Sequence, residues 1–473
     1  MLRASAACEA AGFPSSSLVA TAFVEQAKAT RVGLGYPNLP WATLVGHPAV
    51  QTPDQLRHNV TSVTVPEVIA NLTGALAEGA TANAEPSVRD IVFKGGFADL
   101  NQHFIEREWS DGLPINPPTR ARIEAFLSHT QRDPEEVLGI MLPDSRAATI
   151  WSVAVNGVMA GCRPEYMPVL VALAEAMADP EHGVEHSGNT PGGETLIILN
   201  GPVVKALGFN YTQGVMRDGF QANTTVGRFW RLYLRNVAGF LPHKTDKATY
   251  GNTWRVAIAE NDDAVRAIGW QPLSVDQGFA DGDSTVTIAR YTGGGMASSM
   301  SGSKPEGLLD YLADGLIKNT FWQIMFSVGT GYGKLRPLAL ITPIIAETIA
   351  ASGWSKDDVK QYLFEKARIP AWEFERMLRD WTGKPVWSLT DEARKGSIPA
   401  DVYAVSEDPG RLVPIVWEPS HFMVVVTGDP GRTSGYMFGH NGQFGFPVTK
   451  KIAVSAPSPV SSPSTDSARR SPA

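Results

Sequence analysis

The chain has 473 residues, of which 43% are hydrophobic and 19% are charged, and its formal net charge is −7. This composition is typical of a soluble globular protein with two or three domains. The negative charge argues against a nucleic-acid or anionic-membrane partner, and two cysteines exclude a disulfide framework. The sequence has neither a signal-peptide core nor an apolar run of about 18 residues. We therefore expect a cytoplasmic protein without a membrane span, and we expect a homo-oligomer.

Residues 1–80 alternate helix and strand patterns. Helices are predicted at 4–11, 22–31, 52–59 and 65–78, and strands at 17–20 and 41–45. This order predicts a small parallel α/β unit. Such units normally open with a strand that is followed by a reactive loop, so we expect that the first strand and its loop are missing here. The alternative is a domain that simply starts with a helix.

Residues 87–455 are predicted to form a larger mixed α/β domain, after a small polar linker at 81–86. Its helices are expected at 117–129, 133–142, 224–237 and 355–367, and its strands at 195–199, 285–289, 338–341 and 423–427. The Ser/Pro-rich residues 456–473 are predicted to be a disordered tail. The fold class is therefore α/β, with a small N-terminal unit that lacks its first strand and a larger mixed domain.

Cys162 is the first candidate for chemistry. It stands just before a predicted helix at 164–177 whose first residue is Pro164. The helix dipole and the neighbouring Arg163 should both lower the pKa of the thiol and favour the thiolate. The alternative is that Cys162 is a small buried hydrophobic residue, as most unpaired cysteines are.

Two polar loops offer further candidates. In the first, 109–119, three prolines and a glycine fix a backbone that presents Ser110 and Asp111, either to line a site or to form an Asx-type turn. In the second, 185–194, His186 with a neighbouring carboxylate could carry out acid–base chemistry, and Asn189 could line the same site. A solvated loop histidine is the alternative.

Two arginines could bind an anionic group of a substrate. Arg228 shares one helix face with Arg231 and Arg235, which predicts either a carboxylate or phosphate clamp or a solvated basic face. Arg432 lies in a Gly-rich loop after a strand, which predicts either an anion-binding loop or a plain hairpin turn. The histidines lack paired metal-ligand spacing, so we predict no metal site, and no cofactor is assigned.

The chain resembles the UGSC family of (seleno)proteins, named after a Sec/Cys-Gly-Ser-Cys motif. The resembling segments are Trp-Ser-Asp-Gly-Leu-Pro at 109–114, Pro-Pro-Thr at 117–119, 158–166 around Cys162, 223–235, Gly-Trp-Ser-Lys at 353–356 and Pro-Val-Thr-Lys at 447–450. The resemblance extends over residues 1 to about 455 and implies thiol or selenol chemistry. However, this chain contains no Cys-Gly-Ser-Cys, so no redox residue can be transferred from the family.

Three functions follow as hypotheses. The first is a thiol-dependent reductase or bond-cleaving enzyme that acts on a small anionic organic substrate at a cleft between two domains, with a thiol reductant as a candidate partner. In it, Cys162, His186 and Asp111 are catalytic. The remaining site residues bind the substrate: Ser110, Arg163, Asn189, Arg228 and Arg432. The second is a diverged, non-catalytic binding subunit. The third is a thiol-independent hydrolase or lyase that uses His186 and carboxylates.

Overall fold

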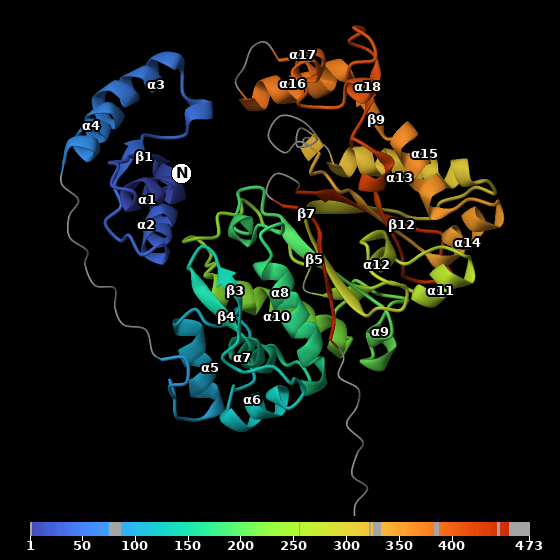
Figure 1. Ribbon diagram of the computed structural model, residues 1–473, viewed down its shortest axis with the longest axis horizontal. Coiled ribbons are helices and arrows are strands. Elements are labelled where there is room, and N and C mark those ends of the chain that lie inside the picture. The colour runs from blue at the N-terminus through green and yellow to red at the C-terminus, as the bar shows by residue number, and fades with distance from the viewer. Residues whose placement is uncertain are drawn as a thin grey trace, which may run out of the picture.

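A computed structural model describes residues 2–74, 87–254, 256–320, 323–324, 333–382, 387–441 and 445–453 (Figure 1). The predicted linker at 81–86 and the predicted tail at 456–473 lie outside the described residues. No helix in the described part of the chain is long and apolar enough to cross a membrane.

The N-terminal residues form a small α/β unit around two parallel strands (Figure 1). Ser17 lies opposite Trp41 in this pair. The third helix begins with a complete capping box between Thr52 and Gln55, and Pro53 occupies the first turn, where no N–H partner is needed. This order of elements confirms the prediction of a parallel α/β unit. Its elements are α1 (Leu2–Ala10), β1 (Ser17–Ala20), α2 (Val24–Gly33), β2 (Trp41–Leu44), α3 (Pro53–Asn59) and α4 (Val65–Thr73).

The N-terminal unit contacts the rest of the protein through polar groups. Lys247 donates from Nζ to the carbonyl of Ala22 at 2.9 Å, and its ammonium lies 5.4 Å from the ring centre of Phe23. On α1, Arg3 forms an ion pair with Glu185 at 3.2 Å. The unit is therefore attached beside the predicted loop at 185–194.

A curled, mixed sheet forms the centre of the larger part of the protein. Among the described residues it has seven strands, in the order β11-β8-β12-β7-β5-β6, with β13 also paired to β7. The pairs β8/β11 and β5/β6 are parallel, and the other pairs are antiparallel. The strands are β5 (Glu194–Asn200), β6 (Ala257–Ala259), β7 (Thr285–Ala297), β8 (Leu338–Ile341), β11 (Met423–Val426), β12 (Gly435–His440) and β13 (Val448–Lys451).

Helices cover one face of this sheet (Figure 1). One core joins β5 and β7 to α7, α8 and α10, and a second joins β11 and β12 to α13, α14 and α15. The helices of this larger part of the protein, whether or not they cover the sheet, are α5 (Phe97–Glu106), α6 (Arg120–Leu127), α7 (Ile150–Ala160), α8 (Met167–Ala178), α9 (Val203–Ala206), α10 (Gln221–Tyr233), α11 (Asp262–Ala267), α12 (Leu273–Asp276), α13 (Pro305–Thr320), α14 (Pro343–Ala351), α15 (Lys356–Lys366), α16 (Ala371–Thr382), α17 (Leu389–Arg394) and α18 (Ala400–Tyr403).

The opposite face of the sheet encloses a third core. Ile258 of β6 and Val425 of β11 belong to the same buried cluster, although these strands are the two edges of the sheet. The sheet therefore curls around this cluster until its edges approach each other. The edges are joined by a hydrogen bond from the N–H of Asn261 to the carbonyl of Val426, at 2.8 Å.

The carboxylate of Glu260 holds the two edges together. It is almost fully buried and accepts hydrogen bonds from the N–H of Val426 at 3.1 Å, from the N–H of Leu273 at 2.7 Å and from Nδ2 of Asn200 at 2.7 Å. Burial raises the pKa of Glu260. One side chain thus satisfies donors from β5, β11 and α12.

The predicted helix at 133–142 is wrong. Residues of β3 (Val137–Met141) pair there with β4 (Arg146–Thr149) in an antiparallel ribbon. Glycine is a poor helix former, and at Gly139 a Cβ atom would lie 2.6 Å from Cβ of Ala178. The strand therefore approaches α8 at a point where only glycine fits. Asp133, at the expected helix start, instead caps a turn by accepting from the N–H of Glu135. A second short ribbon pairs β9 (Arg368–Pro370) with β10 (Leu412–Pro414).

Replacing Glu260 by alanine should destabilise the fold strongly. The change leaves the N–H groups of Val426 and Leu273 and the amide of Asn200 without their acceptor in the core. We expect a loss of about 3–5 kcal/mol in the free energy of unfolding, since each unsatisfied buried donor costs about 1–3 kcal/mol. Urea denaturation measures this loss. The matched control, exposed Glu365→Ala on α15, should change stability by less than about 0.5 kcal/mol, and equal effects of the two variants would contradict the role of Glu260.

Candidate functional site

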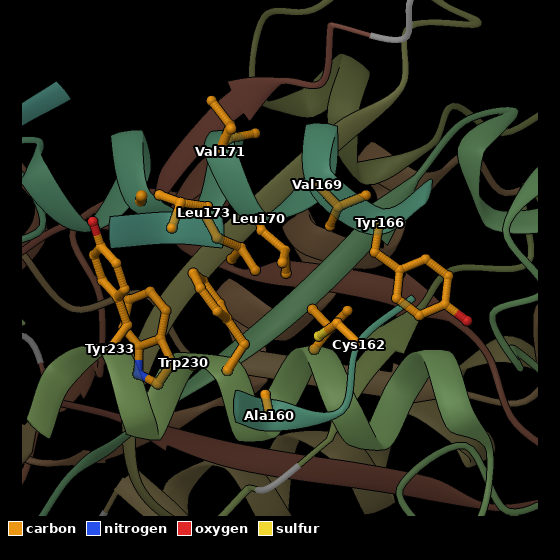
Figure 2. Packing of buried hydrophobic residues seen from close by; sticks show 14 of the residues in the cluster. Ala160, Cys162, Tyr166, Val169, Leu170, Val171, Leu173, Trp230 and Tyr233 are labelled. Atoms are coloured by element: carbon orange, nitrogen blue, oxygen red, sulfur yellow. The ribbon is translucent and has the colours of Figure 1, made fainter. Parts of the chain in front are cut away.

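Cys162 lies in the hydrophobic core rather than on a loop surface. Gly161 adopts the left-handed conformation, with φ of 85°, and ends α7. Pro164 then starts a short 3-10 turn that continues into α8. Cys162 is 8% exposed, and Figure 2 shows its sulfur among apolar side chains near Ala160 and Tyr166.

Burial determines the protonation state of Cys162. It raises the pKa of the thiol to about 12, and a hydrogen bond with Thr225 and the charge of Arg228 offset it only in part. Arg163 points elsewhere, donating to the carbonyl of Leu207 at 3.1 Å and stacking 4.8 Å from the ring centre of Tyr166. The expected lowering of the thiol pKa is therefore wrong, because desolvation outweighs the nearby positive charge.

The structure joins Asp111 to Arg228. The guanidinium donates to both carboxylate oxygens, at 2.8 Å and 3.1 Å, and also to the carbonyl of Pro114 at 2.9 Å. Both side chains are mostly buried. Ser110 donates from Oγ to the carbonyl of Leu113 at 2.6 Å, which closes a turn in the same loop. These contacts fasten the loop at 109–119 to α10, so Arg228 already binds a carboxylate of the protein itself.

The remaining arginines of this helix face are also paired. Arg231 forms ion pairs with the buried Glu194 at 3.0 Å and with Asp246 at 3.5 Å. Arg235 donates to the carbonyl of Glu108 at 3.0 Å. These three arginines therefore do not form a solvated basic face. They form a row of ion pairs and hydrogen bonds that leads from Arg228 toward the start of β5.

Arg290, near the middle of β7, is the centre of a buried polar cluster. Its side chain is almost fully buried, and it donates to the carbonyl of Gly183 at 3.1 Å and to Oγ of Ser187 at 3.1 Å. Nε2 of His182 lies 3.4 Å from the same nitrogen. Burial lowers the pKa of Arg290 to about 10, while the charges of Glu194 and Glu185 oppose the shift. The cluster therefore adjoins the Arg231–Glu194 pair.

His186 lies beside Arg290 where the N-terminal unit meets the larger part of the protein. Its Nε2 is 3.8 Å from a carboxylate oxygen of Glu185, which is paired with Arg3 on α1. The pKa of His186 is lowered to about 4, first by burial and then by the charges of Arg290, Arg3 and Lys334, against the opposing effect of Glu185. The charges of three cations from separate segments thus act with burial to keep the imidazole neutral.

Several buried polar atoms of this region meet no hydrogen-bond partner among the described residues. They are Nε of Arg290, both side-chain heteroatoms of Asn441 and Nδ2 of Asn189. Asn441 is fully buried, and its N–H donates to the carbonyl of Arg290 at 2.8 Å. A native protein usually satisfies such atoms, so this region contains several buried polar atoms whose hydrogen-bonding demand is unmet among the described residues.

Arg432 lies elsewhere, in the loop between β11 and β12. A plain hairpin is wrong here, because β11 and β12 do not pair with each other but both pair with β8. The side chain of Arg432 is exposed. The loop N–H groups of Gly428, Gly431 and Ser434 all donate to acceptors of the protein, which argues against an anion-binding loop.

The sequence thus indicated His186, Asn189 and a carboxylate in the loop 185–194, but not Arg290, Asn441 or the buried His182. A signal was available for Arg290, since a lone arginine interrupts the apolar strand Val-Thr-Ile-Ala-Arg-Tyr. Neither Asn441 nor His182 lies in a recognisable pattern. Within the described ranges there is no group of three or more His, Cys, Asp or Glu side chains that could hold a metal ion.

Iodoacetamide at pH 7 should distinguish the two cysteines. Cys8 is exposed and Cys162 is buried, and only the thiolate reacts. We expect Cys162 to react at least about 100-fold more slowly than Cys8, as measured by mass spectrometry of the labelled peptides over time. In guanidinium chloride both residues should react equally fast, which controls for peptide detection. Native labelling of Cys162 as fast as that of Cys8 would show that its thiol is accessible and ionised.

Acid should destabilise the protein through its buried histidines. Burial lowers the pKa values of His182, His186, His421 and His440 in the folded state, those of His186 and His421 to about 4. A histidine in the unfolded chain has a pKa of about 6.5. The unfolded state therefore binds more protons between these values, so the histidine contribution to stability is complete above about pH 6.5 and is lost as pH falls toward 4.

Urea denaturation between pH 7.5 and 4.5 measures this dependence. His421→Gln should lose less stability than the wild type over that range, because one titrating group has been removed. The comparison isolates the histidine from the carboxylates, which also titrate. Parallel curves for the two proteins would contradict the lowered pKa of His421.

The comparisons with known proteins concern the N-terminal unit. The model of the UGSC family matches residues 1–74, which span β1, β2 and the helices around them; the match does not extend to the resembling segments between 109 and 450. No curated protein matches this chain, and no solved structure matches it. Residues 1–74 are therefore similar to the UGSC family, which agrees with the predicted resemblance over this part of the chain.

Proposed function

We propose that this protein is a thiol-independent enzyme, of the lyase type, that abstracts a proton from a small anionic organic substrate beside His186. The observation that carries the proposal is the buried Arg290, which donates to Ser187 next to His186 and whose Nε meets no acceptor among the described residues. Arg3 of α1 reaches the same loop through its ion pair with Glu185. The proposed site therefore lies where the N-terminal unit meets the larger part of the protein.

Arg290 is proposed to bind the anionic group. Its Nε has no acceptor among the described residues, and its burial strengthens any charge-assisted hydrogen bond that it forms. Nδ2 of Asn189 and both side-chain heteroatoms of Asn441 also lack partners among the described residues of this region. A carboxylate, with several acceptor positions on two oxygens, matches these donors.

His186 is proposed to be the general base. A neutral imidazole takes a proton from the carbon next to the substrate carboxylate, and the guanidinium of Arg290 stabilises the electron pair left on the substrate. That pair then forms a double bond to the adjacent carbon as the leaving group there departs with its bonding electrons. The bound anion also offsets the charges of Arg290, Arg3 and Lys334. The pKa of His186 therefore rises when substrate binds, which makes the imidazole a stronger base only in the complex.

The first hypothesis, thiol-dependent catalysis by Cys162, receives less support. The thiol is buried among apolar side chains, and its pKa is raised to about 12. Its neighbours are Thr225 and Arg228, whereas those of His186 are Glu185 and the three cations. We therefore assign Cys162, Asp111, Ser110 and Arg228 to the packing of α10 and its loop. The thiol reductant, the homo-oligomer and the cytoplasmic location stay predictions, and so does the non-catalytic alternative.

The test uses a panel of small carboxylic acids, with malonate, malate, tartrate and citrate as probes. Thermal unfolding of the full chain identifies the acids that raise the midpoint, and Arg290→Lys should reduce that rise. Stabilising acids are then incubated with the protein in D2O, and proton NMR follows exchange of the hydrogen next to the carboxylate. His186→Asn should lower the exchange rate at least about 100-fold, the contribution of a general base, while binding remains.

Two control variants complete the experiment. His58 is exposed on α3, so His58→Asn should exchange at the wild-type rate, and Cys162→Ala should do the same if the thiol is only structural. Exchange that persists in His186→Asn but is lost in Cys162→Ala would overturn the proposal in favour of the thiol-dependent enzyme. If none of the acids stabilises the protein, the proposed anion site is wrong.

A further inference from the structure

A cavity of about 680 Å³ lies where several strands of the curled sheet end, apart from the His186 region. It is bounded by the last residues of β7 and β8, by the start of β12 and by the segment 214–218. Ligands of open α/β sheets commonly bind beyond the carboxyl ends of parallel strands, and β8 and β11 are such a pair. The volume lies within the range of about 300–1,000 Å³ typical of small-molecule sites.

The walls of this cavity are mainly apolar and include two aromatic rings. Trp254 and Tyr436 both pack on Phe438 of the inner core, with ring centres 5.2 Å and 4.7 Å apart. Met216 and Leu340 contribute aliphatic surface. Aromatic and thioether side chains adapt to planar apolar molecules. The cavity therefore favours a ligand with a flat apolar body.

The polar groups of the cavity define the rest of the ligand. Nε1 of Trp254 is buried and meets no acceptor in the described part of the chain. Arg217 and Asp218 stand side by side on the exposed rim, so their opposite charges give the entrance no net charge. The loop N–H groups of Gly428 and Ser434 are already bonded within the protein. An anionic ligand thus finds little here, whereas the indole N–H of Trp254, a residue that lines the cavity, still lacks an acceptor in the described part of the chain.

We propose that this cavity is a binding site for an uncharged, largely apolar and planar small molecule that carries one carbonyl-type acceptor for Trp254. Its body lies between Trp254, Tyr436 and Met216, and its acceptor takes the hydrogen bond from Nε1. The site is separate from the proposed anion site, so the two bind ligands of different chemistry. The loop between β11 and β12 forms one wall of this proposed binding site.

Two fluorescent probes of similar size test the proposal. Prodan is a neutral naphthalene ketone, whereas N-phenyl-naphthylamine is neutral but has no carbonyl group. Both should bind the full-length protein with a blue shift of their emission. Trp254→Phe keeps an aromatic wall but removes the N–H, so it should weaken prodan about 5-fold, the loss expected for one hydrogen bond. The binding of N-phenyl-naphthylamine should change less than about 2-fold.

Two further variants establish the location. Met216→Arg puts a charge into the apolar wall and should weaken both probes at least about 10-fold. Trp372 is exposed on α16, so Trp372→Phe should change neither affinity and controls for the loss of a tryptophan. Melting temperatures verify that each variant is folded. The proposal is overturned if the wild type binds neither probe, if Met216→Arg binds both normally, or if Trp254→Phe weakens both probes equally.

Discussion

The carboxylate of Glu260 is the constraint on which the arrangement of the larger part of this protein depends. A curled sheet with free edges exposes unpaired N–H and C=O groups, and here one buried side chain satisfies donors from both sides of the opening. Once the edges are held, the inner core is enclosed and the opposite face is free for helices. The apolar cavity lies at the strand ends of the curled sheet, and the charged region lies beside the N-terminal unit.

The two regions illustrate how burial acts differently on different groups. For Cys162, desolvation dominates and makes the thiol inert, although an arginine lies nearby. For His186, desolvation and neighbouring cations act in the same direction, and both keep the imidazole neutral. The sequence shows which charged residues stand next to Cys162 and His186. It does not show how far each side chain is shielded from solvent. Whether a side chain is reactive therefore depended on packing, which is a property of the folded chain.

Periodicity predicted local elements well, as the parallel pair near Ser17 and the helix that starts after Ser355 illustrate. The prediction failed at Gly139, where tertiary contact with α8 overrode a plausible helix start. In the candidate site, His186 could be inferred because a histidine in a Gly-rich loop is conspicuous. Arg290 and Asn441 could not be joined to it, because they lie more than 100 residues apart from it in the chain and only the order of strands in the sheet brings them close.

The contrast between the two cysteines has a consequence for handling the protein. Oxidants and other thiols reach a sulfur in proportion to its exposure and its thiolate fraction, so Cys8 on α1 is open to attack while Cys162 is protected inside the core. Ageing in air would therefore link chains through their N-terminal units, or cap Cys8 with small thiols, without damaging the interior. Heterogeneity of that kind would arise at the surface of α1, five residues beyond Arg3.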